Sequence, residues 1–97
     1  MKITAEISMI FKERNDLLKA AANVILEDEK DRLVIKNVRI IEGKKELFMS
    51  LPARKNGKNE YKEICYPLTA DLRKRMSRAV LAAYAEAMEK TSSDQFA

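Results

Sequence analysis

The side chains with the clearest chemical potential are the lysines and arginines of residues 44–78. This stretch holds 10 basic and 4 acidic residues, a balance of +6, whereas residues 1–43 balance at 0 and residues 79–97 at −2. A local excess of positive charge indicates an anionic partner such as DNA or RNA. The candidate contacts form two groups: Arg54, Lys55 and Lys58 around Asn56-Gly57, and Arg73, Lys74, Arg75 and Arg78 early in a predicted helix.

The second group is informative because cations are locally unfavourable at the start of a helix. A helix N-terminus carries about half a positive charge, so each cation there costs a few tenths of a kcal/mol. A bound phosphate reverses that sign, since free backbone N–H groups and arginine side chains both bind anions. An alternative stays open, in which Asp71, Glu63 or an acidic group of a partner neutralises the cluster. The first group could equally be a solvated turn.

Aromatic side chains near the basic stretch offer a second kind of contact. Tyr61 and Tyr66 could stack on unpaired bases, as in single-strand binding proteins. They could also lie at the edge of the core with only the hydroxyl in water. Tyr84 falls on the apolar face of the predicted helix and is expected in the core.

The composition argues against catalytic, metal and cofactor sites. With no histidine and Cys65 as the single cysteine, the chain has no histidine-based metal site, no Ser-His-Asp or Cys-His pair and no internal disulfide. The acidic residues of 27–31 lack the spacing of a calcium loop and are expected in a solvated connection. We therefore expect neither an enzyme nor a small-molecule substrate. No membrane-length apolar run or signal-peptide pattern occurs, so we expect a cytoplasmic protein without membrane contact.

The elements that must position these side chains begin with strands. Period-two alternation and β-branched content predict five of them, at residues 3–11, 19–27, 33–41, 47–51 and 61–66. In the first strand, every odd position from Ile3 to Phe11 is expected to face the core. The third strand, rich in valine and isoleucine, is expected to be more deeply buried.

Turn signals separate these strands. Asn15-Asp16 is one, and Asn56-Gly57 is the strongest because both residues tolerate the positive φ of a type I′ hairpin. If that hairpin is tight, Met49 lies opposite Ile64. Pro52 makes a looser tip equally compatible with the sequence.

A single helix is predicted from about Ala70 to Met88, with Thr69 as its cap. Its apolar face comprises Leu72, Met76, Ala79, Val80, Ala83, Tyr84 and Ala87. We expect an α+β fold, an antiparallel meander of about five strands with one C-terminal helix, forming one domain over residues 1–90. Residues 91–97 are expected to be a flexible polar tail. Because aromatic residues are only 6% of the chain, the core is thin, and we expect a homodimer.

The chain resembles the stage V sporulation protein G (SpoVG) family. The resemblance covers about residues 1–88 and rests on Met1-Lys2-Ile3-Thr4, Val38-Arg39-Ile40-Ile41-Glu42-Gly43, Leu47-Phe48-Met49, Leu51-Pro52, Pro67, Ala79-Val80-Leu81 and Tyr84. It implies a small bacterial homodimer that binds DNA and RNA, regulates genes and acts in septation in spore formers. It also implies a curled antiparallel sheet followed by a helix.

The resemblance extends to part of the candidate surface. It supports Arg54, Lys55 and Arg73 as nucleic-acid contacts, whereas Lys58, Lys74, Arg75 and Arg78 are suggested by charge alone. Tyr66 stands where the family usually has histidine before the proline. A rival hypothesis is a protein-interaction module at the cell-division site, whose basic surface binds an acidic protein.

Overall fold

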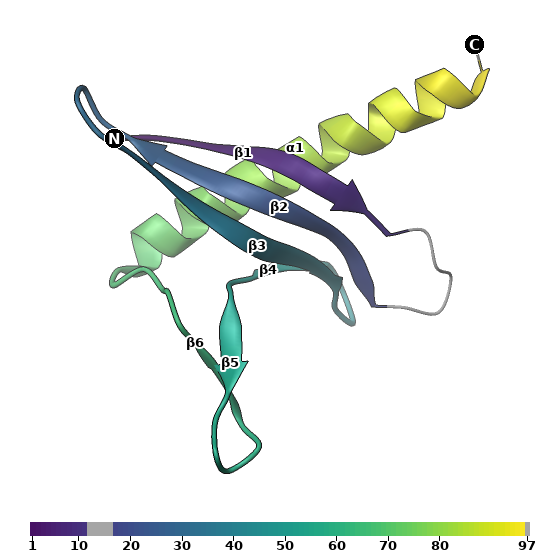
Figure 1. Cartoon of the computed structure of the whole chain (residues 1–97). Helices are drawn as coiled ribbons and strands as arrows, with labels where there is room; N and C mark the ends of the chain where they lie inside the picture. Colours follow the sequence, from purple (N-terminus) through teal and green to yellow (C-terminus); the bar gives the residue numbers. More distant parts are fainter. Residues whose placement is uncertain (12–16, 97) are drawn as a thin grey trace.

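The computed structural model describes residues 1–11 and 17–96, with side chains placed as far as Lys90. Four strands form one antiparallel sheet in chain order, two more form a separate hairpin, and one helix follows (Figure 1). The elements are β1 (Lys2–Ile10), β2 (Leu18–Glu27), β3 (Arg32–Glu42), β4 (Leu47–Ser50), β5 (Ala53–Lys55), β6 (Tyr61–Glu63) and α1 (Ala70–Phe96). The predicted α+β class is therefore confirmed, with six strands in two sheets rather than about five in one.

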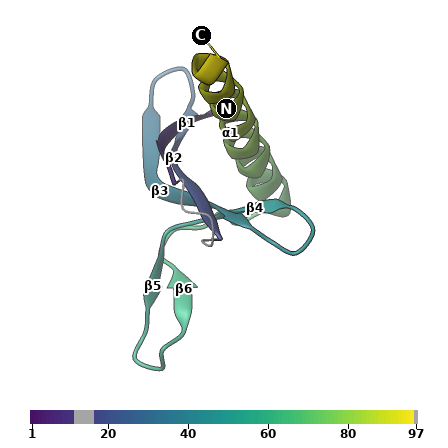
Figure 2. The same cartoon turned by 90° about the vertical axis from the view of Figure 1, so that its right-hand side faces the viewer.

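The core lies between one face of the four-stranded sheet and α1, which crosses that face (Figure 2). On β2 the predicted alternation is confirmed, because Ala20, Ala22 and Val24 are fully buried. From the helix, Met76 and Val80 lie one turn apart and are also buried. The alanines leave room for the helix to approach the sheet closely. Ile3, Ala5, Ile7, Leu72 and Tyr84 are among the partly buried side chains that surround this core.

A register shift in β1 contradicts the alternation predicted as far as Phe11. Ile7 pairs with Ala22, but Met9 pairs with Ala21, so Ser8 is an extra residue on β1. An extra residue of this kind reverses which side chains face the core. Met9 is consequently exposed, at 56%, instead of buried.

The prediction that the third strand is the more deeply buried one was wrong. Leu33 and Val34 are 59% and 47% exposed, and Val38 and Ile40 are the fully buried residues of β3. Val34 pairs with Ile25, which follows the buried Val24 on β2, so both lie on the sheet face opposite the helix. In the described part of the chain that face has no second layer, so a valine- and isoleucine-rich strand is buried on one side at most.

The connection between β4 and β6 also departs from the tight hairpin. Met49 pairs with Ile40 of β3 rather than lying opposite Ile64. Pro52 follows β4, and the chain then enters the separate hairpin, where Ala53 pairs with Glu63. Of the two compatible arrangements, the looser one is realised.

The hairpin turn is built differently from the predicted type I′ turn. Gly57 does not have a positive φ, and the left-handed residue is Asn59 at 64°. The Asn56 side chain organises the loop, because its Oδ1 accepts hydrogen bonds from the N–H groups of Lys58 (2.8 Å) and Glu60 (3.0 Å). Two asparagines thus shape the loop: Asn56 supplies the side-chain acceptor and Asn59 adopts the left-handed backbone conformation.

The helix start is confirmed. The Leu72 N–H donates to Thr69 Oγ1 at 3.2 Å, which is the bond of an N-terminal cap. The helix continues past Met88 to Phe96, beyond its predicted end. The flexibility expected for residues 91–97 stays a prediction, and the Asn15-Asp16 turn lies outside the described residues. In the part of the chain that the structure describes, α1 is not apolar enough to cross a membrane.

Candidate nucleic-acid interface

The β5–β6 hairpin leaves the body beside the start of α1 (Figures 1 and 2). Two contacts attach its base. The Ile64 N–H donates to the Pro52 carbonyl at 2.9 Å, closing the hairpin. Arg73 of α1 donates two hydrogen bonds to Glu63 of β6, from Nη2 to Oε1 at 2.9 Å and from Nη1 to Oε2 at 3.3 Å. These contacts attach the hairpin that carries the first group of cations to the helix start that carries the second.

Arg73 therefore already has a carboxylate partner within the chain. The hydrogen bond to Glu63 raises the pKa of the Arg73 guanidinium, so the arginine stays charged. Its side chain remains 43% exposed. Of the helix-start cations, Arg73 is therefore neutralised by Glu63, as the alternative interpretation of the sequence proposed. Its predicted contact with nucleic acid would require Arg73 to share or leave this partner.

The other helix cations differ in what they contact. Arg75 Nη2 donates to the Met1 carbonyl at 2.9 Å, which attaches the beginning of β1 to the helix. Lys74 and Arg78 are exposed and, among the described residues, make no side-chain hydrogen bond or ion pair. They are four residues apart, so they share one side of the helix.

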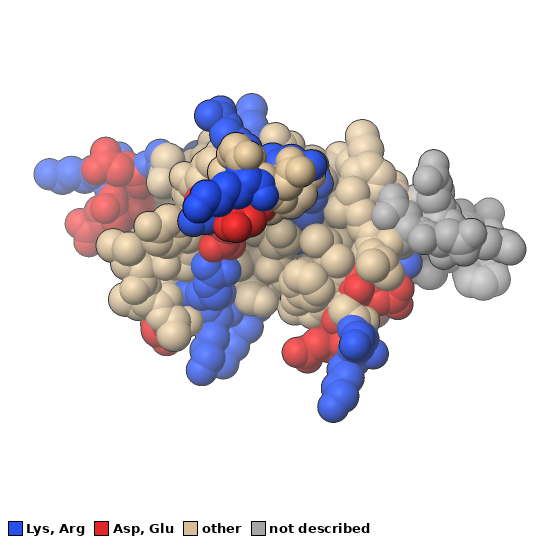
Figure 3. All heavy atoms as spheres, turned by 90° about the horizontal axis from the view of Figure 1, so that it is seen from below, with Lys and Arg blue, Asp and Glu red and all other residues tan. Residues whose placement is uncertain are grey.

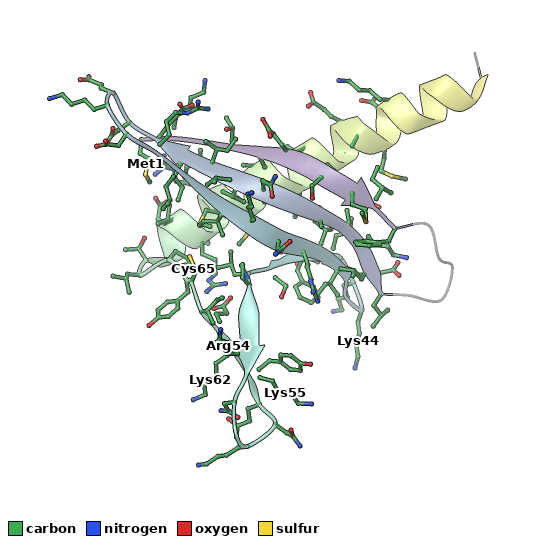
Figure 4. All side chains as sticks on the ribbon, in the orientation of Figure 1. Met1, Lys44, Arg54, Lys55, Lys62 and Cys65 are labelled. Atoms are coloured by element: carbon green, nitrogen blue, oxygen red, sulfur yellow. The ribbon has the colours of Figure 1, made fainter. Side chains whose placement is uncertain are left out.

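On the hairpin, strand alternation divides the cations between two faces. Arg54 pairs with Lys62, so these two side chains share one face. Lys55 pairs with Tyr61 on the other, and Lys55 Nζ lies 5.8 Å from the centre of the Tyr61 ring. Figure 4 shows the two sets pointing to opposite sides of the hairpin. Lys58 is exposed in the loop between the strands.

Lys62 is a further candidate contact that the sequence prediction did not name. It has no hydrogen bond or ion pair within the described chain and lies directly across from Arg54. The β5–β6 register is what reveals it, and that register depends on a five-residue loop rather than the tight turn that the Asn56-Gly57 pair predicts.

In the view from below, lysine and arginine side chains lie on and beside the hairpin, with carboxylate side chains next to them (Figure 3). Of the seven residues predicted to contact nucleic acid, five have side chains that make no hydrogen bond or ion pair within the described residues: Arg54, Lys55, Lys58, Lys74 and Arg78. Such groups can bind phosphate oxygens without first breaking an internal ion pair. This end of the molecule is thus chemically suited to a polyanion.

The remaining candidates take different positions. Tyr61 and Tyr66 are 73% and 59% exposed, whereas Tyr84 is partly buried against the core as predicted. Cys65 is half-buried in the connection to the helix (Figure 4). Across residues 1–11 and 17–96, no group of three or more cysteine, aspartate and glutamate side chains could hold a metal ion.

Comparison with known proteins identifies the family. The SpoVG family model matches residues 1–86. A protein of Finegoldia magna named "Putative septation protein SpoVG" is 40% identical over 76 residues, covering 78% of this chain and 68% of its own length. Proteins with the same name from Treponema denticola and Caldanaerobacter subterraneus are 43% identical over 67 residues (69% of each chain) and 32% identical over 78 residues (80% and 82%). The chain therefore belongs to the SpoVG family.

Proposed function

We propose that this protein binds DNA or RNA through the β5–β6 hairpin and the start of α1, and that it acts as a non-enzymatic regulator in the cytoplasm. The observation that carries the proposal is the position of Glu63 and Arg73. Their ion pair joins the hairpin to the start of α1, which supports a binding region that draws on unpaired cations from both chain segments. The relatives' name adds septation as the process in which the regulator acts.

Phosphate contacts supply most of the affinity in this proposal. Each phosphate that a cation neutralises releases counterions, which makes the affinity fall steeply with salt. Five unpaired cations on one protomer correspond to a slope of log affinity against log salt of about −4 to −5 on duplex DNA. A few arginine or asparagine side chains would add base readout.

The proposal includes a homodimer. Tyr66 and Leu68 are 59% and 89% exposed and lie at alternate positions in the connection before α1. Apolar side chains exposed so close together favour a protein contact. A two-fold axis would present the basic surface twice. Sedimentation equilibrium at micromolar concentration should give twice the chain mass of 11.1 kDa, and a mass of one chain would contradict the dimer.

The test of nucleic-acid binding is a titration of labelled duplex DNA and of RNA at several salt concentrations. If the nucleic acid contacts the cations of both the hairpin and the helix, the slope of log affinity against log salt should be about −4 to −5. It should be about twice that if both protomers of a dimer bind. A slope near zero, or no binding at low salt, would refute the proposal.

A protein-interaction module at the division site is the second candidate. The relatives' name supports it, as do β1 and β4, which are the edge strands of the described sheet and can pair with another chain. Competition separates the two functions. If duplex DNA displaces the protein partner, both use the basic surface, whereas a partner complex that DNA leaves intact favours the interaction module.

A further inference from the structure

We propose that the groove between the outer face of the sheet and the β5–β6 hairpin binds unpaired bases of a single-stranded nucleic acid. The proposal rests on nucleic-acid binding as the function, and it adds a site and a preference for strands whose bases are free. The site lies outside the seven cations singled out in the sequence, except for Lys55 at its edge.

The groove is a built feature of this fold. It has a volume of about 540 Å³, within the range of small-ligand pockets. One wall comes from the sheet face opposite α1, and the other from the base of the hairpin. Its lining consists of Asn37, Arg39, Ile41, Ser50, Leu51, Pro52, Ala53, Tyr61 and Ile64. None of these residues is acidic, so the groove contains positive charge and no carboxylate.

Tyr61 supplies the surface on which a base could stack. Its side chain is 73% exposed although it lines the groove, so much of the ring remains available to a ligand. Lys55 Nζ lies over one face of the ring, 5.8 Å from its centre, so a base would stack on the other face and Lys55 would bind a phosphate of the same strand. Aromatic rings combined with nearby cations are the usual means of binding single strands without strong sequence preference.

The sheet wall supplies hydrogen-bond donors. Arg39 lies opposite Ser50 in the β3–β4 register, and its guanidinium has no hydrogen bond or ion pair among the described residues. Asn37 adopts a left-handed backbone (φ 62°) where the register of β2 and β3 shifts. Register shifts of this kind often redirect a side chain at a binding site. An arginine and an asparagine can both hydrogen-bond to the edge of a base.

Charge decides between the possible occupants. An apolar segment of a second copy would bury Arg39 against apolar groups and leave its guanidinium without an acceptor, which is unfavourable. A nucleotide offers an aromatic face for Tyr61, edge acceptors for Arg39 and a phosphate for Lys55. In a duplex the base faces are stacked and unavailable, so the groove selects single strands.

The experiment measures the anisotropy of labelled twelve-nucleotide oligo(dT), oligo(rA) and a matched duplex with the full chain. We expect Tyr61→Ala to weaken single-strand binding about 5- to 100-fold, since base stacking on an aromatic side chain has this magnitude. Tyr61→Phe should keep the affinity. Arg39→Gln should weaken single-strand binding more than duplex binding. Circular dichroism establishes that each variant is folded.

Leu33→Ala is the control, because Leu33 of β3 is 59% exposed but lines neither the groove nor the proposed dimer contact. It should bind single strands like the parent chain. A direct readout is tyrosine fluorescence, since the chain has three tyrosines and no tryptophan. Oligo(dT) should quench the emission of the parent chain and should quench it much less in Tyr61→Phe.

Three results would overturn the site. The first is parent-like single-strand binding by Tyr61→Ala and Arg39→Gln. The second is an equal loss in Leu33→Ala. The third is a halved sedimentation mass in Tyr61→Ala with unchanged oligonucleotide affinity, which would assign the groove to a second copy. Failure of the parent chain to bind any nucleic acid would instead refute the proposed function, and the groove site with it.

Discussion

The Arg73 guanidinium of α1 forms two parallel hydrogen bonds with the Glu63 carboxylate of β6, at 2.9 and 3.3 Å. This pair joins the hairpin to the body through two residues that are ten positions apart in the chain. Both side chains are partly exposed, at 43% and 34%, so solvent weakens their attraction and the pair contributes little to stability. Its main consequence is geometric, because it sets where the hairpin cations lie relative to those of the helix.

Glu63→Gln should release the Arg73 charge for a phosphate, while the glutamine carbonyl oxygen still accepts one of the two hydrogen bonds and keeps the hairpin attached. We expect tighter DNA binding and a salt slope steeper by about one, because one more cation becomes available. The free energy of unfolding should fall by only about 0–1 kcal/mol, as for other exposed ion pairs. Both quantities follow from DNA titrations at several salt concentrations and from urea denaturation.

Glu60→Gln is the matched control, since it removes the same charge from the hairpin without freeing an arginine. Its side chain makes no ion pair among the described residues. It should leave the salt slope unchanged. If both variants change the slope equally, the Arg73–Glu63 pair does not limit access to Arg73.

Reversing two helix cations should weaken binding without unfolding the protein. Lys74→Glu combined with Arg78→Glu removes two cations that have no internal partner in the described chain. We expect the affinity for duplex DNA to fall about tenfold or more and the salt slope to decrease by about two. Arg73 is left intact, because a glutamate there would repel Glu63 and could detach the hairpin.

The control for that double variant is Lys30→Glu combined with Lys90→Glu. It changes net charge equally, but Lys30 lies in the β2–β3 connection and Lys90 near the far end of α1, both away from the hairpin (Figure 1). A similar loss of affinity in both double variants would mean that net charge, and not this surface, governs binding.

The two glycines should respond in opposite directions to alanine. At Gly43 an added Cβ would come within 2.9 Å of the Glu46 carbonyl oxygen and 3.2 Å of the Phe48 ring. Gly43→Ala should therefore lower the free energy of unfolding by about 1–3 kcal/mol, as other overpacked sites do. Urea denaturation followed by circular dichroism measures the change.

Gly57 provides the comparison, because an added Cβ there meets nothing within 4 Å and its φ is not positive. Gly57→Ala should leave stability unchanged or raise it by about 0.4–1 kcal/mol through a less flexible unfolded chain. A destabilisation equal to that of Gly43→Ala would contradict the described hairpin loop.

Asp28 should give the β2–β3 connection a pH dependence in acid. Hydrogen bonds from the backbone N–H groups of Asp31 and Lys30 lower the pKa of the Asp28 carboxyl, and both N–H groups donate to its Oδ1. A lowered folded-state pKa means that the stabilisation is present above the unfolded pKa of about 3.9 and is lost as pH falls through the folded value. An NMR titration should place the Asp28 midpoint below the value of about 3.9 for an unperturbed aspartate.

Hydrogen exchange tests the same contact. Asp28→Ala should accelerate exchange of the Lys30 and Asp31 amides, whereas Asp28→Asn, which retains an acceptor oxygen, should keep much of the protection. Exchange in Asp28→Ala as slow as in the parent chain would show that the carboxylate does not organise this connection.

The sequence predicted those features that depend on neighbouring residues. Thr69 identified the helix start because a cap bonds within one turn. The alternation of Ala20, Ala22 and Val24 identified the buried face of β2 because side chains alternate along any strand. The basic stretch identified the candidate surface, since charge can be counted without knowing the fold.

The missed features depend on long-range pairing. Ser8 looks like one more polar position until the Met9–Ala21 pair shows that it is an extra residue. The separate hairpin follows from β4 pairing with β3, which left β5 and β6 to pair with each other. Likewise, nothing near Arg39 in the chain relates it to Tyr61, although both line one groove.

By itself, then, the amino-acid order determined the α+β class, the cap at Thr69 and the identity of the cations available for a polyanion, because each is a property of local pattern or composition. The tertiary structure decided which of those cations remain unpaired and which faces they share. Glu63 and Arg73 illustrate the reason: whether a carboxylate meets a given arginine depends on strand register and helix placement, which many distant contacts determine together.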